Sequence, residues 1–126
     1  MNKLLNPPDW PVPATYSHGF SVPSSSRTVY VAGQIGVDPK GNVPAGIAAQ
    51  TRQALENIRT ILRMDGMDMA NIVKTTVFLI EPSDFTEFGK TRSEILGATK
   101  PASTLVYIKQ LIRPEFLVEI EAIAVG

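Results

Sequence analysis

The chain has 126 residues, no cysteine and one histidine, and its 12 basic residues balance its 12 acidic residues. This length fits one domain over residues 1–126, and the composition excludes disulfides, thiolate metal sites and a cysteine nucleophile. Balanced charge argues against a nucleic-acid partner. No apolar run approaches the length of a membrane span, and residues 1–8 lack the apolar region of a signal peptide, so we expect a cytoplasmic protein.

The first half of the chain is expected to contain two strands and a helix. Residues 1–15, rich in Pro and Asn, are interpreted as an irregular lead-in. Strands are expected over residues 16–22 and 28–35, and Gly33 within the second predicts a bulge or a close backbone approach. Apolar residues at three- and four-residue steps then predict an amphipathic helix over about residues 46–64.

The second half is expected to contain three strands and another helix. A β-rich run predicts a strand over residues 72–80. The next helix is expected to begin after Asp84, with Glu87 completing a capping-box-like pair. Strands over residues 102–108 and 116–125 complete the order β-β-α-β-α-β-β. Two helices can cover only one face of the resulting sheet, so the predicted class is α+β.

The last strand has two contrasting faces. The small apolar residues suit packing against helices; these are Val118, Ile120, Ala122 and Ala124. The other face mixes aliphatic side chains with carboxylates; these are Leu117, Glu119, Glu121, Ile123 and Val125. A solvated face would not carry these aliphatics, and a monomer core would not carry unpaired carboxylates. We therefore expect this face to lie between subunits and to contain a polar pocket.

Three blocks, Ala32–Ile35, Ile72–Leu79 and Val118–Val125, resemble the RidA/YjgF family of reactive-intermediate deaminases, also called the L-PSP endoribonuclease family. The resemblance extends from about Pro13 to the end of the chain. It implies a chorismate-mutase-like fold with a mixed sheet, and a homotrimer with ligand clefts between subunits. It also implies hydrolysis of enamines or imines to a keto acid and ammonia, with no metal or organic cofactor.

The same resemblance implies the site residues, position by position. The family's tyrosine, glycine and glutamate match Tyr16, Gly33 and Glu119. The positions of its serine, asparagine, substrate-binding arginine and cysteine hold Ala32, Gly89, Ser103 and Leu105. The arginine grips the substrate carboxylate, a task suited to a planar guanidinium. Its loss predicts poor use of the usual small α-imino acids.

Each candidate residue also has a structural interpretation. Glu119 is predicted to position or deprotonate water, the alternative being a carboxylate paired with Lys or Arg. Tyr16 and Gly33 are predicted to hold the ligand, the alternatives being a strand aromatic and a simple bulge. Ser103 and Thr104 are predicted to offer hydroxyls to the ligand, the alternative being strand-edge hydroxyls bonded to the backbone.

Other polar residues are assigned structural roles. We interpret Lys90 and Arg92 as residues of a solvated helix face, the alternative being that one replaces the lost guanidinium by reaching across the cleft. His18 is interpreted as a surface or packing residue, Trp10 as an anchor of the lead-in, and Glu121 as an interface partner.

Three functions remain open at this stage. The first is a cofactor-independent hydrolase or deaminase acting on a small enamine, imine or related unsaturated amino acid, for which an aminomuconate-like acid is one possibility. The alternative is a trimer that binds a small metabolite or a protein partner without turnover. The third is an RNA-cleaving protein, against which the balanced charge and the single histidine argue.

Overall fold

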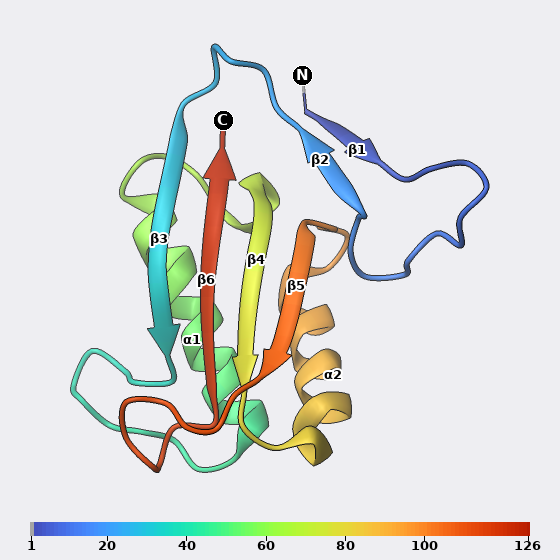
Figure 1. The fold of residues 1–126 in the computed structure, drawn as a ribbon. Coiled ribbons are helices and arrows are strands. Elements are labelled where there is room, and N and C mark those ends of the chain that lie inside the picture. The colour runs from blue at the N-terminus through green and yellow to red at the C-terminus, as the bar shows by residue number, and fades with distance from the viewer. Residues whose placement is uncertain (1) are drawn as a thin grey trace.

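A four-stranded sheet backed by two helices forms most of the structure, a computed structural model that describes residues 2–126. The predicted domain thus begins one residue before the described part. In chain order the elements are β1 (Lys3–Leu5), β2 (Gly19–Ser21), β3 (Thr28–Ile35), α1 (Ile47–Arg63), β4 (Ile72–Leu79), α2 (Phe85–Leu96), β5 (Ala102–Tyr107) and β6 (Val118–Val125) (Figure 1). Short 3₁₀ turns, Met69–Asn71 and Pro82–Asp84, precede β4 and α2.

The sheet is mixed, as the sequence predicts. Its strand order is β3-β6-β4-β5; β4 and β5 run parallel, and β6 runs antiparallel to both β3 and β4. A separate antiparallel pair joins β1 to β2. The prediction of an irregular lead-in is wrong for β1, and the expected strand over 16–22 shrinks to Gly19–Ser21. Both short strands exist through mutual pairing, which their local sequence does not reveal.

The core lies between the helices and one face of the sheet. The predicted inner face of β6 is confirmed, since Val118, Ile120, Ala122 and Ala124 are at most 3% exposed. From α1, the predicted apolar stripe contributes Leu55, Ile58 and Leu62, each at most 1% exposed. Figure 1 shows both helices behind the sheet, so the opposite face is left uncovered within one chain.

The uncovered face carries charged, polar and apolar side chains together. The residues that alternate with the inner face on β3, β4 and β6 include Tyr30, Lys74, Thr76, Glu119, Glu121 and Ile123. Tyr30 is 77% exposed. We name these six residues the open face.

Two predicted members of this face are corrected. The last strand begins at Val118 rather than Phe116, because the Leu117 backbone N–H donates to Gln50 Oε1 at 2.8 Å and the Leu117 side chain packs against the core. Val125 is 1% exposed within the single chain. Val125 is therefore not available to cover a partner, and Leu117, which is half-buried, lies before the strand rather than on its outer face.

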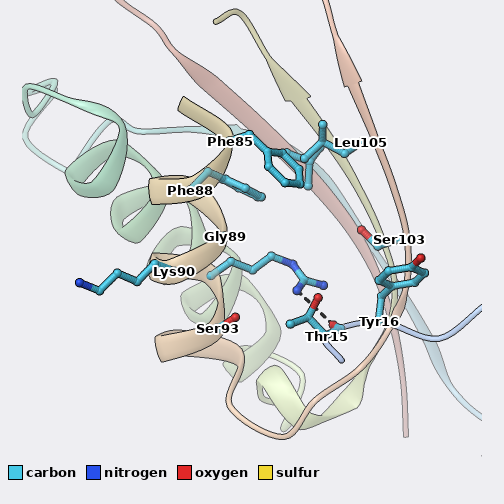
Figure 2. Close-up of a pocket in the computed structure, with 11 residues that line it drawn as sticks. Thr15, Tyr16, Phe85, Phe88, Gly89, Lys90, Ser93, Ser103 and Leu105 are labelled. Atoms are coloured by element: carbon cyan, nitrogen blue, oxygen red, sulfur yellow. Dashed lines mark hydrogen bonds between the residues drawn. The ribbon is translucent and has the colours of Figure 1, made fainter. Parts of the chain in front are cut away.

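The start of α2 also differs from the prediction. The Asp84 side chain makes no capping hydrogen bond, and the residue already has helical backbone angles. The capping pair with Glu87 is wrong because α2 continues directly from the 3₁₀ turn that begins at Pro82. Ser103 and Leu105 on the edge strand β5 lie across from this helix (Figure 2).

Within residues 2–126, no helix is both long and apolar enough to cross a membrane.

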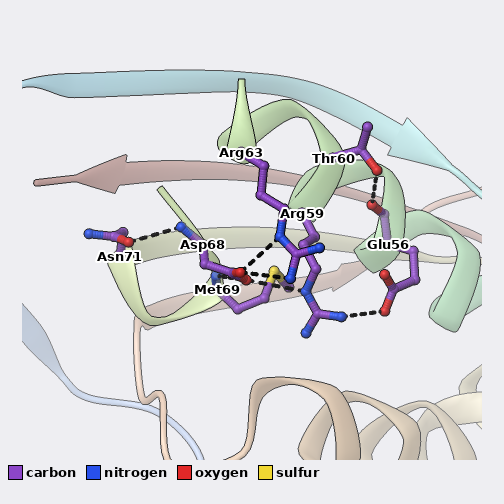
Figure 3. Close-up of polar contacts among 7 residues, drawn as sticks. All are labelled: Glu56, Arg59, Thr60, Arg63, Asp68, Met69 and Asn71. Carbon is purple, nitrogen blue, oxygen red and sulfur yellow. Dashed lines mark hydrogen bonds and ion pairs between the residues drawn. The ribbon is translucent and has the colours of Figure 1, made fainter. Parts of the chain in front are cut away.

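A polar network around Asp68 joins the end of α1 to the start of β4 (Figure 3). Asp68 caps the 3₁₀ turn by accepting from the Met69 N–H at 2.7 Å, and Asn71 Oδ1 accepts from the Asp68 N–H at 2.9 Å. The same carboxylate accepts from Arg59 at 3.2 Å and from Arg63 at 2.9 Å. The Met69 N–H and then Arg63 hold the pKa of Asp68 below its usual value.

Replacing Asp68 with Ala is expected to lower the free energy of unfolding by about 1 kcal/mol, the usual value of a lost cap. Because the folded-state pKa is lowered, this contribution is fully present above the unfolded value of about 3.9 and is lost as pH falls through the folded value. Urea titrations at neutral and acidic pH measure it. Asp65→Ala is the control, since it removes only the exposed pair with Arg27. Equal losses in both variants would contradict the capping role.

Candidate active site

A cavity of about 500 Å³ lies between α2 and the edge strand β5. It brings together residues far apart in the sequence: Thr15, Tyr16, Val77, Phe85, Phe88, Gly89, Lys90, Arg92, Ser93, Ser103 and Leu105. Four of the predicted ligand-binding positions are among them, namely Tyr16, Gly89, Ser103 and Leu105. Figure 2 shows Tyr16 and Ser103 on one side of this space and the residues of α2 on the other.

Strand β5 divides its hydroxyls between the two faces of the sheet. Ser103 lies beside Thr75 of β4, and Thr75 Oγ1 donates to Ser103 Oγ at 3.0 Å. Thr104 points to the other face, where it accepts from Lys74 Nζ at 2.8 Å. Ser103 therefore lines the cavity and Thr104 does not. Both hydroxyls bond to side chains, so the alternative of backbone-bonded strand hydroxyls is wrong.

The segment before β2 holds Tyr16 at the cavity. Ser17, 1% exposed, donates from its backbone N–H to the Pro101 carbonyl at 3.1 Å and from its hydroxyl to the Lys100 carbonyl at 2.7 Å. The His18 ring contacts Tyr16 edge-on, with centroids 5.8 Å apart, and contacts Trp10 in the same way at 5.0 Å. Trp10 and His18 thus pack the lead-in, as predicted, and steady the tyrosine.

Arg92 is the functional candidate that the sequence interpretation placed wrongly. It is only 8% exposed and lines the cavity, so it does not belong to a solvated helix face. Burial lowers the pKa of its guanidinium. The spacing along the helix could have predicted this burial. Arg92 follows Phe88 by four residues and precedes Leu96 by four, which places it on the buried stripe of α2. Lys90, in contrast, is exposed and points away from β5 (Figure 2).

Gly33 and Glu119 meet on the opposite side of the sheet. The β3–β6 register shifts between Val31 and Gln34, which confirms the predicted bulge. A Cβ added at Gly33 would lie 2.6 Å from Glu119 Oε2, so the close approach is confirmed too, and the approaching group is the carboxylate itself. Glu119 pairs with Phe78 in register, on the open face. The predicted catalytic residue thus does not line the cavity of its own chain.

A second hollow of about 450 Å³ lies on the open face. It is lined by Tyr30, Val31, Ala32, Lys74, Thr76, Glu121, Ala122 and Ile123. Ala32 therefore lies apart from the four predicted ligand-binding residues that line the cavity. Across residues 2–126, neither Glu119 nor Glu121 forms an ion pair, and no cluster of three or more His, Asp or Glu side chains could hold a metal.

Comparisons with known proteins bear on this arrangement. The model of the Endoribonuclease L-PSP family matches residues 10–126. A relative from Escherichia coli K12, named 2-iminobutanoate/2-iminopropanoate deaminase, is 42% identical over 101 residues, covering 77% of this chain and 78% of that protein.

Solved structures show the same fold. The Rid-family protein YyfB from Yersinia pestis superposes with a TM-score of 0.84 at 28% identity, covering 98% of this chain and 97% of that one. Escherichia coli TdcF with bound serine gives a TM-score of 0.74 at 32% identity, covering 98% of both chains. These likenesses confirm the predicted chorismate-mutase-like α+β fold. The chain belongs to the Endoribonuclease L-PSP family, which is the RidA/YjgF family.

Proposed function

We propose that this protein is a cofactor-independent deaminase that hydrolyses the C=N bond of an imino acid, or of the enamine that interconverts with it, in clefts between the subunits of a homotrimer. We further propose that residues 1–126 act as one domain in each subunit. The observation that carries the proposal is the cavity between α2 and β5, which gathers four of the family's ligand-binding positions around a buried guanidinium. A relative named as a deaminase of imino acids supports the same chemistry.

The positions of the two halves of the site support the proposed assembly. The cavity opens between α2 and β5, whereas the Glu119 carboxylate lies over Gly33 on the other face of the sheet. One chain therefore offers the cavity without the carboxylate. The open face is also left uncovered, with Tyr30 exposed. In the proposed trimer, open faces pack together, and the Gly33–Glu119 edge of one copy completes the cavity of the next.

The proposed chemistry needs only water and one carboxylate. Glu119 accepts a proton from a water molecule while the oxygen of that water attacks the imine carbon. The C=N electron pair moves to nitrogen, which takes that proton and leaves a carbinolamine. Glu119 then accepts the hydroxyl proton as the C=O bond forms and the C–N bond breaks, and the departing nitrogen takes this proton to leave as ammonia. One imine and one water thus yield one keto acid and one ammonia.

The experiment uses imines generated in the assay mixture by an amino-acid oxidase, with a different amino acid supplied for each imine. Ammonia release is followed with and without this protein. We expect saturable acceleration, weaker for 2-iminopropanoate because its methyl group covers little of the apolar wall formed by Phe85, Phe88 and Leu105. No acceleration with any imine would reject the deaminase and favour the non-catalytic binding trimer, which the changes at Gly89, Ser103 and Leu105 also support.

A further inference from the structure

We propose that the Arg92 guanidinium binds the substrate carboxylate, so that this group is held from α2 rather than from β5. The inference rests on the proposed function, because it names the group that orients the substrate in the same cleft. It also narrows the substrate class to monocarboxylates with an apolar side chain.

The guanidinium of Arg92 is only partly hydrogen-bonded. Its guanidinium donates from Nη1 to the Thr15 carbonyl at 3.1 Å, a bond drawn in Figure 2. Its Nη2 is buried and has no hydrogen-bond partner among residues 2–126, and none of the carboxylates in that part of the chain pairs with it. A buried cation without a counter-charge is costly. A ligand carboxylate would supply both the charge and the missing acceptor.

The surroundings of Arg92 provide room for such a ligand. Gly89 lies one turn before it on α2, and a Cβ added there would meet nothing within 4 Å. Ser103, on the opposite wall, is short and already accepts a hydrogen bond from Thr75. Gly89 and Ser103, which stand at the positions of the family's asparagine and arginine, are therefore small, and both line the cavity together with Arg92 and its unpartnered Nη2.

The remaining walls indicate the other end of the substrate. Phe85, Phe88 and Leu105 line the same cavity and offer an apolar surface. The other basic residue of the lining, Lys90, is exposed, and its side chain extends away from β5 (Figure 2). One buried cation and an apolar wall suit one carboxylate and an apolar side chain, whereas a second carboxylate would find no second buried cation here.

Arg92 also has a purely structural role available, which is to tether the Thr15 segment through Nη1. The two roles predict different measurements. A tether changes stability when it is removed and is indifferent to the charge of a ligand. A carboxylate-binding residue changes ligand affinity, and removing a buried unpaired cation leaves stability equal or higher.

The test is calorimetric titration of the purified protein with 2-oxobutanoate, a stable keto acid, and with its uncharged methyl ester. We expect the acid to bind and the ester to bind at least about 10-fold more weakly. Arg92→Met should weaken binding of the acid by about 10- to 100-fold. The affinity of Arg92→Lys should lie between those of the wild type and Arg92→Met, because lysine keeps the charge but lacks the planar guanidinium. Arg52→Met is the matched control: it removes an exposed arginine that pairs with Glu94 outside the cavity, and it should match the wild type.

Thermal unfolding of the same variants separates the two roles. We expect Arg92→Met to melt no lower than the wild type while losing the stabilisation that 2-oxobutanoate gives. Equal affinity of Arg92→Met and the wild type for the acid, equal affinity of the wild type for acid and ester, or no binding of the acid would overturn the proposal. If Arg92→Met does not fold, Arg92→Lys and the ester decide the matter.

The proposed function fails in a different way. Titration with 2-oxobutanoate involves no turnover, so Glu119→Gln should retain the binding. Intact, Arg92-dependent binding without imine hydrolysis would reject the deaminase and keep the carboxylate site. If Arg92→Met hydrolyses imines with the kinetics of the wild type, the deaminase is supported and the carboxylate site at Arg92 is rejected.

Discussion

Replacing Glu119 with Gln is expected to lower kcat for imine hydrolysis by about 10²- to 10⁴-fold, the usual contribution of a positioned general base. Gln keeps the shape of the side chain but cannot accept the proton of the attacking water. Glu119 has no ion pair among residues 2–126, so its charge is not needed for pairing within the chain. Stopped assays of ammonia release with saturating imine measure the effect.

The matched control is Glu121→Gln, which removes a carboxylate two residues away on the same strand and face. It should leave kcat within a few-fold of the wild type, because Glu121 lines the open-face hollow rather than contacting Gly33. Equal losses in both variants would point to a general effect on the sheet face. A wild-type kcat in Glu119→Gln would remove the residue from the mechanism.

Replacing Gly33 with Ala is expected to lower kcat by about 10²-fold, which is the usual effect of misplacing a catalytic group by about 1 Å. The added Cβ would lie 2.6 Å from Glu119 Oε2 and 2.8 Å from its carboxyl carbon, so the carboxylate must move. The end of a flexible side chain can move without disturbing the fold. We therefore expect the melting temperature to change little while kcat falls.

A double-mutant cycle shows whether this effect passes through the carboxylate. If Gly33→Ala acts by displacing Glu119, the double variant with Glu119→Gln should be no slower than Glu119→Gln alone. Two losses that multiply would mean that Gly33 acts independently, for example by presenting its backbone N–H to the ligand.

Features set by local periodicity could be predicted from the sequence. The stripe of α1 and the alternation of β6 predict which side chains are buried, and the structure confirms both except at Val125, which is buried although the alternation places it on the outer face. Gly33 could also be predicted, because glycine within a β-rich run signals a bulge or a close approach. The start of α2 could not, because the 3₁₀ turn before Phe85 replaces the cap that Asp84 suggests.

The composition of the cavity depends on long-range packing, which a single sequence does not show. Tyr16 reaches it through the bonds of Ser17 to Lys100 and Pro101, more than eighty residues along the chain. Arg92 is expected to be solvated because charged helix residues usually are. Its place on the stripe between Phe88 and Leu96 pointed the other way, and burial in the structure decides between them.

Two inactive variants can show whether one active site is formed by two copies of the chain. The first is Gly89→Phe, which is designed to block the cavity, and the second is Glu119→Gln. Gly89 lines the cavity, and a Cβ added there meets nothing within 4 Å, so we expect the attached ring to extend into the cavity and block it. This variant keeps Glu119, whereas Glu119→Gln keeps the cavity. Each variant alone should be nearly inactive. Light scattering of each should give about three times the chain mass of 13.7 kDa, as a homotrimer requires.

The central claim is that each active site combines the cavity of one copy with Glu119 of another, and mixing these two inactive variants tests it most directly. After the equimolar mixture is unfolded and refolded together, random assembly should place an intact cavity beside an intact Glu119 in about a quarter of the sites. We predict recovery of about a quarter of the wild-type imine hydrolysis, with no recovery when the trimers are mixed without unfolding. Correctly assembled mixed trimers that stay inactive would contradict the shared site.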